Sequence, residues 1–415
     1  MNLKRVVITG LGALTPIGNT VSDFWNSLVT GVSGANPITH FNPEKFKTKF
    51  ACELKGFNIH DFIEPKDARK IDPCTQYTLV ASMEAIKDSG LAIESIDPER
   101  IGVMLGTGAG GITTIIDPMK EFYNSDGTPR FSPFFIPKVL SNMVSGLISI
   151  RFGFKGPNFV TTSACASSAN SIINAFHFIQ LGKTDVILTG GAEACISEPV
   201  MGGFNGLHAL STRNDDYKTA SRPFDLGRDG FVMGEGAAIL VLEEYEHAIK
   251  RGAKIYAEMG GYGLSADAYH ITLPHPEGLG AMQCMRHAVK DFGLQLSEID
   301  YINAHGTSTP PGDITECKAI ENLFQEHASQ LLISSTKSMT GHLLGGAAAA
   351  ESIASILAIY HGIVPPTINQ FEPDPAIPDL NFVRNTALKK EIRTAISNSF
   401  GFGGHNASLL FKKFE

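Results

Sequence analysis

The chain has 415 residues, of which 43% are apolar and 18% charged, and its net charge is −8. This length allows two or three domain-sized units, or one large α/β unit. No run of Lys or Arg stands out, so the composition argues against a nucleic-acid-binding protein. The 42 glycines are spread along the whole chain, which indicates tight turns rather than a low-complexity tail.

The cysteines and the apolar segments indicate where the protein works. The six cysteines form no CxxC pair, which argues against a zinc ribbon or a disulfide framework and fits a reducing compartment. The N-terminus enters a strand-like run without the apolar region of a signal peptide. The apolar stretch 343–360 is interrupted by Glu351 and rich in small residues, so we expect a buried helix there rather than a membrane span. We therefore expect a cytoplasmic protein.

Short β-branched runs bounded by glycine alternate with helical patterns along the chain. Strands are predicted at residues 5–10, 100–108, 185–191, 237–245, 254–263, 301–307, 331–336 and 394–399. Helices are predicted at residues 25–31, 75–90, 168–182, 244–252, 280–293, 315–324 and 343–361. This alternation indicates an α/β fold with largely buried sheets.

The two halves of the chain resemble each other weakly. GEGAAILVLEE (234–244) and GHNASLLFKKF (404–414) are each a Gly-rich turn followed by a strand of the same length. About 70 residues before each lies a strand, a Ser/Thr-rich turn and a helix of small residues. Two copies of one βα framework would explain the match, and they predict an N-terminal half at 1–253 and a C-terminal half at 254–415.

Cys165 lies in TTSACASSAN (161–170), where a strand-like segment is followed by a helix. Backbone N–H groups at a helix N-terminus favour a thiolate and lower the pKa of a cysteine. The same groups could bind the oxyanion that forms when a thiolate attacks a carbonyl. A small buried filler is the alternative, since free cysteine is commonly buried. The local sequence leaves both interpretations open.

Two histidines and a Gly-rich run occupy similar places. His305 follows a strand in YINAHGTSTP, and His342 follows another, five residues after Lys337. A lone histidine is more often structural, but strand ends that open into loops are where α/β proteins place reactive groups. The run SNSFGFGGHN (397–406) is a tight hairpin that could also bring backbone N–H groups close to a ligand.

Two other patterns do not support a site. GTGAGG (106–111) matches G-x-G-x-x-G but lacks a strand ending in Asp or Glu about 20 residues on, so we predict no dinucleotide site there. His270 and His275 lack a third ligand at a telling spacing, and a loop role is the simpler interpretation.

Together Cys165, His305, Lys337, His342 and the loop 400–404 resemble the elongating β-ketoacyl-[acyl carrier protein] synthases of the type II class, in the thiolase superfamily. The resemblance runs from residue 3 to residue 414 and includes ALSTRND (209–215), SRPFDLGRDGFVMGEGA (221–237) and NAHGTSTPPGD (303–313). It implies an α/β thiolase fold, with duplicated βα halves in a five-layered α-β-α-β-α sandwich. It also implies a homodimeric acyltransferase of fatty acid biosynthesis. Such an enzyme lengthens a carrier-bound acyl chain by decarboxylating Claisen condensation with malonyl-carrier.

The resemblance assigns the catalytic roles. Cys165 would carry the acyl group, and the N–H groups of Cys165 and Phe402 would bind the oxyanion. His305 and His342 would hold the malonyl thioester carbonyl as neutral donors while CO₂ leaves. Lys337 would orient His305 and Glu351.

The remaining roles concern binding. Substrate contacts are expected from Thr307 and Thr309 on the pantetheine arm and from Phe400, Ala109 and Phe204 at the acyl chain. The acyl carrier protein would dock on Lys66, Arg69, Lys70 and Arg130. No cofactor is required, although some relatives hold a structural cation where Asn303, Glu351, Ser397 and Asn398 stand.

Some features separate this chain from neighbouring families. No cysteine follows Cys317, unlike biosynthetic thiolases, and initiating synthases have Asn in place of His342. Three departures from the elongating pattern remain: His405 replaces a usual Thr, Ala109 replaces a bulkier residue, and Phe131 replaces a basic one. A thioester hydrolase, a non-catalytic acyl-binding subunit and a polyketide-type synthase stay open as alternatives.

Overall fold

The computed structural model describes residues 3–415, in which ten strands form one continuous sheet of order β10-β9-β13-β14-β8-β1-β7-β6-β4-β5. The first half of the chain supplies β1 (Val6–Leu14), β4 (Ile101–Gly106), β5 (Asn158–Thr161), β6 (Val186–Glu193) and β7 (Gly236–Glu244). The second half supplies β8 (Ala257–Ala266), β9 (Tyr301–Asn303), β10 (Leu332–Ser334), β13 (Thr394–Gly401) and β14 (His405–Lys412). The two sets meet where β1 pairs with β8 at only two positions, Val7 with Glu258 and Ile8 with Ala257.

Both halves have the same topology. Numbered along the chain within each half, the five strands lie in the order 3-2-4-5-1. The second, third and fourth strands pair in parallel, and the fifth pairs antiparallel with its two neighbours. The structure thus confirms the duplicated βα framework, while the exact boundary at residue 253 stays a prediction.

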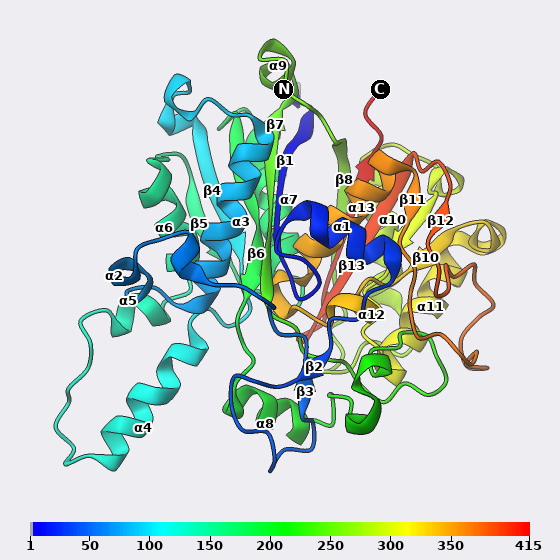
Figure 1. The fold of residues 1–415 in the computed structure, drawn as a ribbon. Helices are drawn as coiled ribbons and strands as arrows, with labels where there is room; N and C mark the ends of the chain where they lie inside the picture. Colours follow the sequence, from blue (N-terminus) through cyan, green and yellow to red (C-terminus); the bar gives the residue numbers. More distant parts are fainter. Residues whose placement is uncertain (1–2) are drawn as a thin grey trace.

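Helices complete the predicted five layers. On the outer faces, α3 (Pro73–Ser89) and α6 (Met143–Phe152) cover the first half-sheet, and α10 (Leu279–Asp291) with α11 (Pro310–Phe324) lies on the second. Between the half-sheets, α7 (Ser167–Gln180) and α13 (Ala347–His361) pack against each other and against strands of both halves. In Figure 1 the strands β4, β5, β6 and β7 of the first half lie to the left of β8, β13 and β10 of the second.

The sequence patterns identified the regular core and missed several surface elements. Every predicted strand and helix corresponds to an element of the structure. The patterns did not indicate α4 (Ile116–Asn124), α5 (Phe135–Val139), α6 or α8 (Glu198–Gly206), nor, among the short elements below, any except α1 and α9. The other short elements are α1 (Val21–Thr30), β2 (Asn36–Pro37), β3 (Phe50–Ala51), α2 (Pro65–Ala68), α9 (Tyr245–Lys250), α12 (Lys337–Thr340), β11 (Ile363–Val364) and β12 (Leu388–Lys389).

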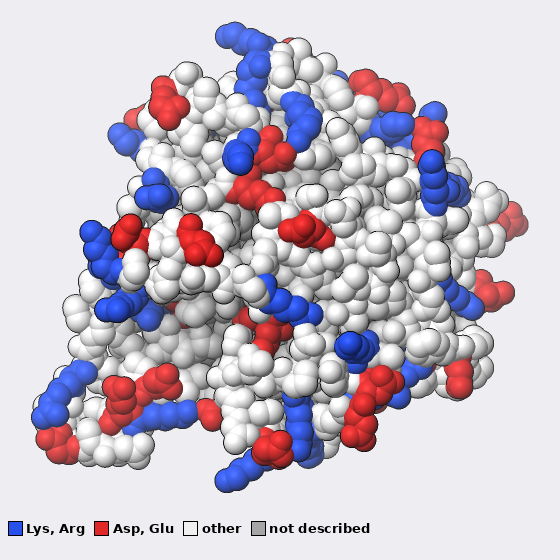
Figure 2. Space-filling view, in the orientation of Figure 1, with Lys and Arg blue, Asp and Glu red and all other residues white. Residues whose placement is uncertain are grey.

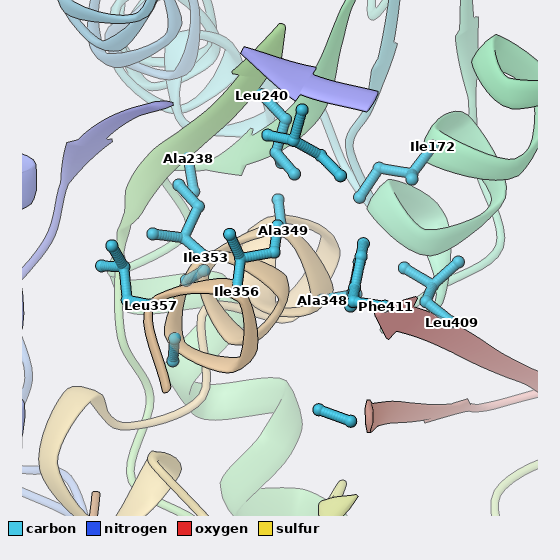
Figure 3. Close-up of a cluster of buried hydrophobic side chains, with 14 of the residues drawn as sticks. Ile172, Ala238, Leu240, Ala348, Ala349, Ile353, Ile356, Leu357, Leu409 and Phe411 are labelled. Carbon is cyan, nitrogen blue, oxygen red and sulfur yellow. The ribbon is translucent and has the colours of Figure 1, made fainter. Parts of the chain in front are cut away.

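The middle layer is the centre of the largest hydrophobic core. Every residue of α13 from Ala347 to Ile359 is buried, which explains the apolar composition of this segment. Figure 3 shows Ala349, Ile353 and Ile356 of α13 beneath the first half-sheet and near α7. The alanines at the start of α13 let it approach α7 closely, and the Ala349 N–H donates to the Ser168 hydroxyl at 3.1 Å. Residues 3–415 include no helix that is long and apolar enough to cross a membrane.

A glycine at the end of β4 sets where α7 begins. A Cβ on Gly106 would lie 2.4 Å from the backbone of Ser167 and Ser168, so no larger residue fits. The first turn of α7 therefore rests directly on β4, and Cys165, just before this turn, lies at the edge of the sheet where the parallel strands end.

Candidate active site

One cavity of about 570 Å³ opens at this edge and is lined by residues of both halves. Nine of the side chains predicted as catalytic or substrate-binding line it: Cys165, His305, His342, Phe402, Thr307, Thr309, Phe400, Ala109 and Phe204. The structure thus brings into one place residues that lie far apart in the sequence.

Cys165 sits in a strained turn before α7. The residue before it, Ala164, has φ of 50°, a left-handed conformation that costs roughly 1–2 kcal/mol for a residue with a side chain. The turn is held by Ser167, whose hydroxyl accepts from the Ser163 N–H at 2.9 Å, and by Ser399, whose hydroxyl donates to the Cys165 carbonyl at 2.8 Å. Cys165 itself is half-buried and faces the cavity.

The acidity of the thiol differs from the sequence-based expectation. Burial raises the pKa of the Cys165 thiol to about 12, although the Lys337 charge and the Phe402 N–H act in the opposite direction. The helix does not reverse this effect because Cys165 precedes the N-cap residue Ala166 and lies outside the first turn of α7. The thiol is therefore protonated at rest, and its proton needs an acceptor before it can attack a carbonyl.

That acceptor is in place. Nε2 of His342 lies 3.0 Å from Sγ of Cys165, and the ring of His305 stands edge-on to that of His342 with 5.4 Å between centroids. One ligand atom from each of these three residues lies within 4.8 Å of the others. Burial and the nearby Lys337 charge lower the pKa of both imidazoles well below 6.5, so both are neutral at pH 7.

Lys337 lies behind this cluster rather than in the cavity. Its side chain is 1% exposed and forms an ion pair with the carboxylate of Glu351 on α13. Burial raises the pKa of Glu351 to about 7, while the Lys337 charge lowers it. A cation fixed there disfavours a second positive charge on either histidine.

Glu316 was not indicated by the sequence patterns, although it positions His305. Its buried carboxylate accepts from the N–H of His305 at 2.9 Å and from the N–H of Gly306 at 2.8 Å. The side chain of Asn398 donates to the same carboxylate at 3.1 Å. The only sequence signal is a carboxylate on the predicted helix eleven residues after His305, and such a residue is normally a solvated one.

The Gly-rich loop 400–404 closes over the nucleophile. A Cβ on Gly401 would lie 2.8 Å from the Ser163 carbonyl and 3.2 Å from the Cys165 nitrogen, so the loop touches the backbone of the nucleophile turn. The N–H of Phe402 is close enough to the Cys165 thiol to lower its pKa. The Phe402 side chain is 36% exposed and lines the cavity. A backbone N–H of the second half thus lies near the thiol, where an oxyanion hole needs a donor.

Three of the four predicted cation ligands fit that role. Asn303 Oδ1, Glu351 Oε2 and Ser397 Oγ are buried and have no hydrogen-bond partner among residues 3–415. Asn303 and Ser397 are paired across β9 and β13, and the Asn303 amide donates to the Glu351 carbonyl at 3.4 Å. Oxygen donors of this kind suit a hard cation.

The side chain of Asn398, the fourth residue of the predicted cation site, lies apart from the other three side chains. Successive side chains on a strand point to opposite faces, so Asn398 faces away from its neighbour Ser397. Its amide nitrogen donates to Glu316, and its oxygen accepts from Ser408 at 2.8 Å. The Asn398 side chain therefore has no free oxygen for the same ion.

The predicted carrier-docking residues lie on the surface, and in the sequence they are far from Cys165, His305 and His342. Lys66, Arg69 and Arg130 are exposed, and Lys70 is half-buried. Acidic neighbours offset two of these charges, because Lys70 donates to Asp67 at 2.7 Å and Arg130 to Asp126 at 3.4 Å. Figure 2 shows Lys and Arg side chains over the edge that carries α2, interleaved with acidic ones.

Comparison with known proteins identifies the family. The chain matches the β-ketoacyl synthase N-terminal domain over residues 3–248 and the β-ketoacyl synthase C-terminal domain over residues 256–371. The chain belongs to the β-ketoacyl synthase family. It is 52% identical over 412 residues, 99% of each chain, to 3-oxoacyl-[acyl-carrier-protein] synthase 2 of Staphylococcus aureus.

Solved synthase structures have the same fold. The ishigamide ketosynthase/chain length factor superposes with a TM-score of 0.93 at 35% identity, covering 100% of both chains. A type II polyketide ketosynthase, solved with its acyl-carrier protein and a bound hexaketide, superposes with a TM-score of 0.92 at 32% identity, over 99% of this chain and 100% of that one. These likenesses agree with the thiolase fold predicted for this β-ketoacyl synthase.

The Lys337 charge predicts how this synthase responds to acid. Because the pKa of His342 lies well below 6.5, the neutral imidazole persists when the pH falls below 6.5, and the acidic limb of a His342-dependent reaction lies below that value. Lys337→Met removes a charge that lowers this pKa, so the acidic limb should move to higher pH. The pH profile of malonyl decarboxylation measures the shift. Lys337→Arg keeps the charge and should keep the limb; equal profiles for Lys337→Met and wild type would contradict the assignment.

Proposed function

We propose that this protein elongates fatty acyl chains by condensing malonyl-[acyl carrier protein] with an acyl group carried on Cys165, giving β-ketoacyl-[acyl carrier protein] and CO₂. The observation that carries the proposal is the cluster of Cys165, His305 and His342 in one cavity, with the Phe402 N–H close to the thiol. The 52% identity to a 3-oxoacyl-[acyl-carrier-protein] synthase 2 over 99% of both chains supports it.

In the first half-reaction the acyl group moves to the enzyme. The Cys165 S–H proton passes to His342 Nε2 at 3.0 Å, and the resulting thiolate attacks the thioester carbonyl. The N–H groups of Cys165 and Phe402 stabilise the oxyanion. The intermediate collapses by breaking the bond to the pantetheine sulfur, which takes the proton from His342. The products are acyl-Cys165, a free carrier thiol and a neutral imidazole.

In the second half-reaction the same histidines act as donors, His342 from the tautomer that carries its proton on Nε2 rather than on Nδ1. Malonyl-carrier enters, and the Nε2–H groups of His305 and His342 hydrogen-bond its thioester carbonyl oxygen. The malonyl carboxylate leaves as CO₂, and the bond electrons form an enolate whose charge these donors stabilise. The enolate carbon attacks the acyl-Cys165 carbonyl, the C–S bond breaks, and the released thiolate takes a proton from solvent, since the original thiol proton left with the carrier. No strong base is needed, which suits imidazoles with lowered pKa.

The alternatives differ in product. A thioester hydrolase would use the same thiolate but release free acid, and a non-catalytic acyl-binding subunit would not acylate Cys165. A polyketide-type synthase would run the same condensation on other chains. The type II polyketide ketosynthase compared above is 32% identical, against 52% for the 3-oxoacyl-[acyl-carrier-protein] synthase 2, which favours fatty acid elongation.

Substitution of Cys165 tests the chemistry. Cys165→Ala should abolish acyl transfer and condensation, because no sulfur remains to carry the acyl group. Cys165→Gln should also stop condensation but retain or increase malonyl decarboxylation, since the amide mimics an acyl-Cys165. Mass spectrometry of the acylated protein and CO₂ release measure these steps. Continued elongation by Cys165→Ala, or free acid as the wild-type product, would contradict the proposal.

Ala109 predicts the length of chain that the cavity takes. Its small side chain lies in an apolar cluster with Ile112, Phe204 and Leu344, all of which line the cavity. Ala109→Ile should fill this space and lower kcat/KM roughly tenfold or more for the longest or branched chains, with little effect on short ones. Ala92→Ile, at an exposed position, is the control. An unchanged chain-length profile in Ala109→Ile would remove Ala109 from the acyl site.

We also propose that acidic helices of an acyl carrier protein dock on Lys66, Arg69, Lys70 and Arg130, with the acidic neighbours Asp67 and Asp126 weakening the attraction. A hard cation bound by Asn303, Glu351 and Ser397 would supply structural charge beside Lys337, with no part in the bond-forming steps. All six cysteines are unpaired, which is consistent with action in a reducing cytoplasm.

A second copy of this chain is the proposed partner for the segment α4–α6. Figure 1 shows α4 projecting from the body, and this segment exposes Tyr123 by 78%, Ile136 by 60% and Ile150 by 74%. The neighbouring β5 is the last strand of the sheet, so one of its edges is open to another strand. A twofold dimer uses the same patch on both copies, and an apolar patch beside an open strand edge supplies both an apolar contact and a strand to pair.

Light scattering tests the dimer. The wild-type protein should have twice the mass of one chain, and Ile150→Asp should give a monomer because it places a charge in the apolar contact. Val32→Asp changes an exposed apolar residue outside this segment and should leave the dimer intact. A monomeric wild type, or a dimer that survives Ile150→Asp unweakened, would place the interface elsewhere.

A further inference from the structure

Glu193, at the end of β6, is a buried carboxylate without a cationic partner. It is 0% exposed, and no ion pair joins it to a Lys, Arg or His within residues 3–415. Burial raises its pKa, while hydrogen bonds from neutral groups lower it. Its charge is therefore stabilised by four donors, and these donors come from two loops in different halves of the chain.

Three of the donors belong to the loop that follows β4 and forms one wall of the cavity. The N–H of Gly108 donates at 2.7 Å, the N–H of Ala109 at 3.1 Å and the hydroxyl of Thr107 at 3.0 Å. Ala109 lines the cavity, so this carboxylate fixes the position of the wall that an acyl chain would meet.

The fourth donor belongs to the turn that follows His342. The N–H of Gly345 donates to Oε2 of Glu193 at 2.9 Å, and the preceding residue, Leu344, is held at φ of 47° with its side chain toward the cavity. A Cβ on Gly345 would lie 2.2 Å from the Gly108 nitrogen and 2.6 Å from Glu193 Oε2. The two loops thus touch with the carboxylate between them, and only glycine fits at that contact.

We infer that Glu193 is a positioning residue that joins the Ala109 wall of the acyl cavity to the turn carrying His342. An acyl chain that presses against the wall then also sets the position of His342 for the second half-reaction. This inference rests on the proposed condensing function. It predicts that the link matters most for the malonyl step and for chains long enough to reach the wall, and matters little for acylation by short chains.

Glu193→Gln tests the link. The amide keeps the volume of the side chain, but its NH₂ group replaces one accepting oxygen and so faces backbone N–H groups without being able to accept from them. The enzyme is first acylated with a series of thioesters from acetyl to palmitoyl, and mass spectrometry gives the acylated fraction of Cys165. Malonyl-carrier is then added, and CO₂ release is measured in a single turnover. We expect the variant to acylate with short chains as wild type does, and to release CO₂ roughly 10- to 100-fold more slowly with long chains, since small misplacement of a catalytic group has effects of this size.

Glu84→Gln is the matched control, because the Glu84 carboxylate also accepts two backbone N–H groups, those of Ala13 and Val21, away from the cavity. It should leave both steps unchanged. Equal slowing of acylation and CO₂ release at every chain length in Glu193→Gln would indicate a purely structural role and overturn the inference, as would an unchanged CO₂ rate.

Should Glu193→Gln fail to fold, Thr107→Val removes one of the four donors, and the same selective slowing, smaller in size, is expected. Equal or absent effects there would overturn the inference as well. Failure of the condensing function itself is distinguishable, because it would appear in the wild-type protein as an absence of acyl-Cys165 or of CO₂ release.

Discussion

The contact between α7 and α13 is the interaction on which the rest of the site depends. Each helix belongs to one half of the chain, and each begins shortly after a catalytic residue: Cys165 precedes α7, and His342 precedes α13. Small side chains at the N-terminal ends of both helices allow close packing there. Because these two ends meet, Nε2 of His342 lies 3.0 Å from the thiol of Cys165. The chemistry therefore follows from duplication: two similar strand–turn–helix units, packed face to face, place their turns together.

Burial is the second constraint, and it decides the protonation of the site. It keeps the thiol of Cys165 protonated and both imidazoles neutral, so the reactive forms arise by proton transfer within the cluster rather than by ionisation in the resting enzyme. The buried carboxylates around the site are stabilised in two ways. Glu351 pairs with Lys337, whereas Glu316 and Glu193 accept mainly from backbone N–H groups and so hold loops in place.

The sequence predicted the parts of the site that local patterns mark. Strand ends followed by Gly-rich or Ser/Thr-rich turns indicated the places of Cys165 and His342, whereas the prediction that Ser397 and Asn398 bind the same cation did not use the period of two along β13. Long-range contacts were not predictable in this way. Glu316 and Glu193 matter because of which backbone N–H groups tertiary packing brings to them, and the raised pKa of Cys165 follows from burial, which no single stretch of sequence reveals.

His405 lies on the outer side of the loop 400–404, whereas the residues that face the nucleophile turn lie on its inner side. The imidazole is exposed, is absent from the cavity lining and lies against Gly403, where an added Cβ would come within 3.2 Å of the ring. Gly401 and Phe402, on the inner side of the same loop, face the nucleophile turn. A change at His405 therefore acts on the outer side of the loop and reaches the thiol only by moving the Phe402 N–H. The inner surface of the loop is held at Gly401, where the backbone contacts Ser163 and Cys165, whereas His405 on the outer surface has no such contact with the nucleophile turn.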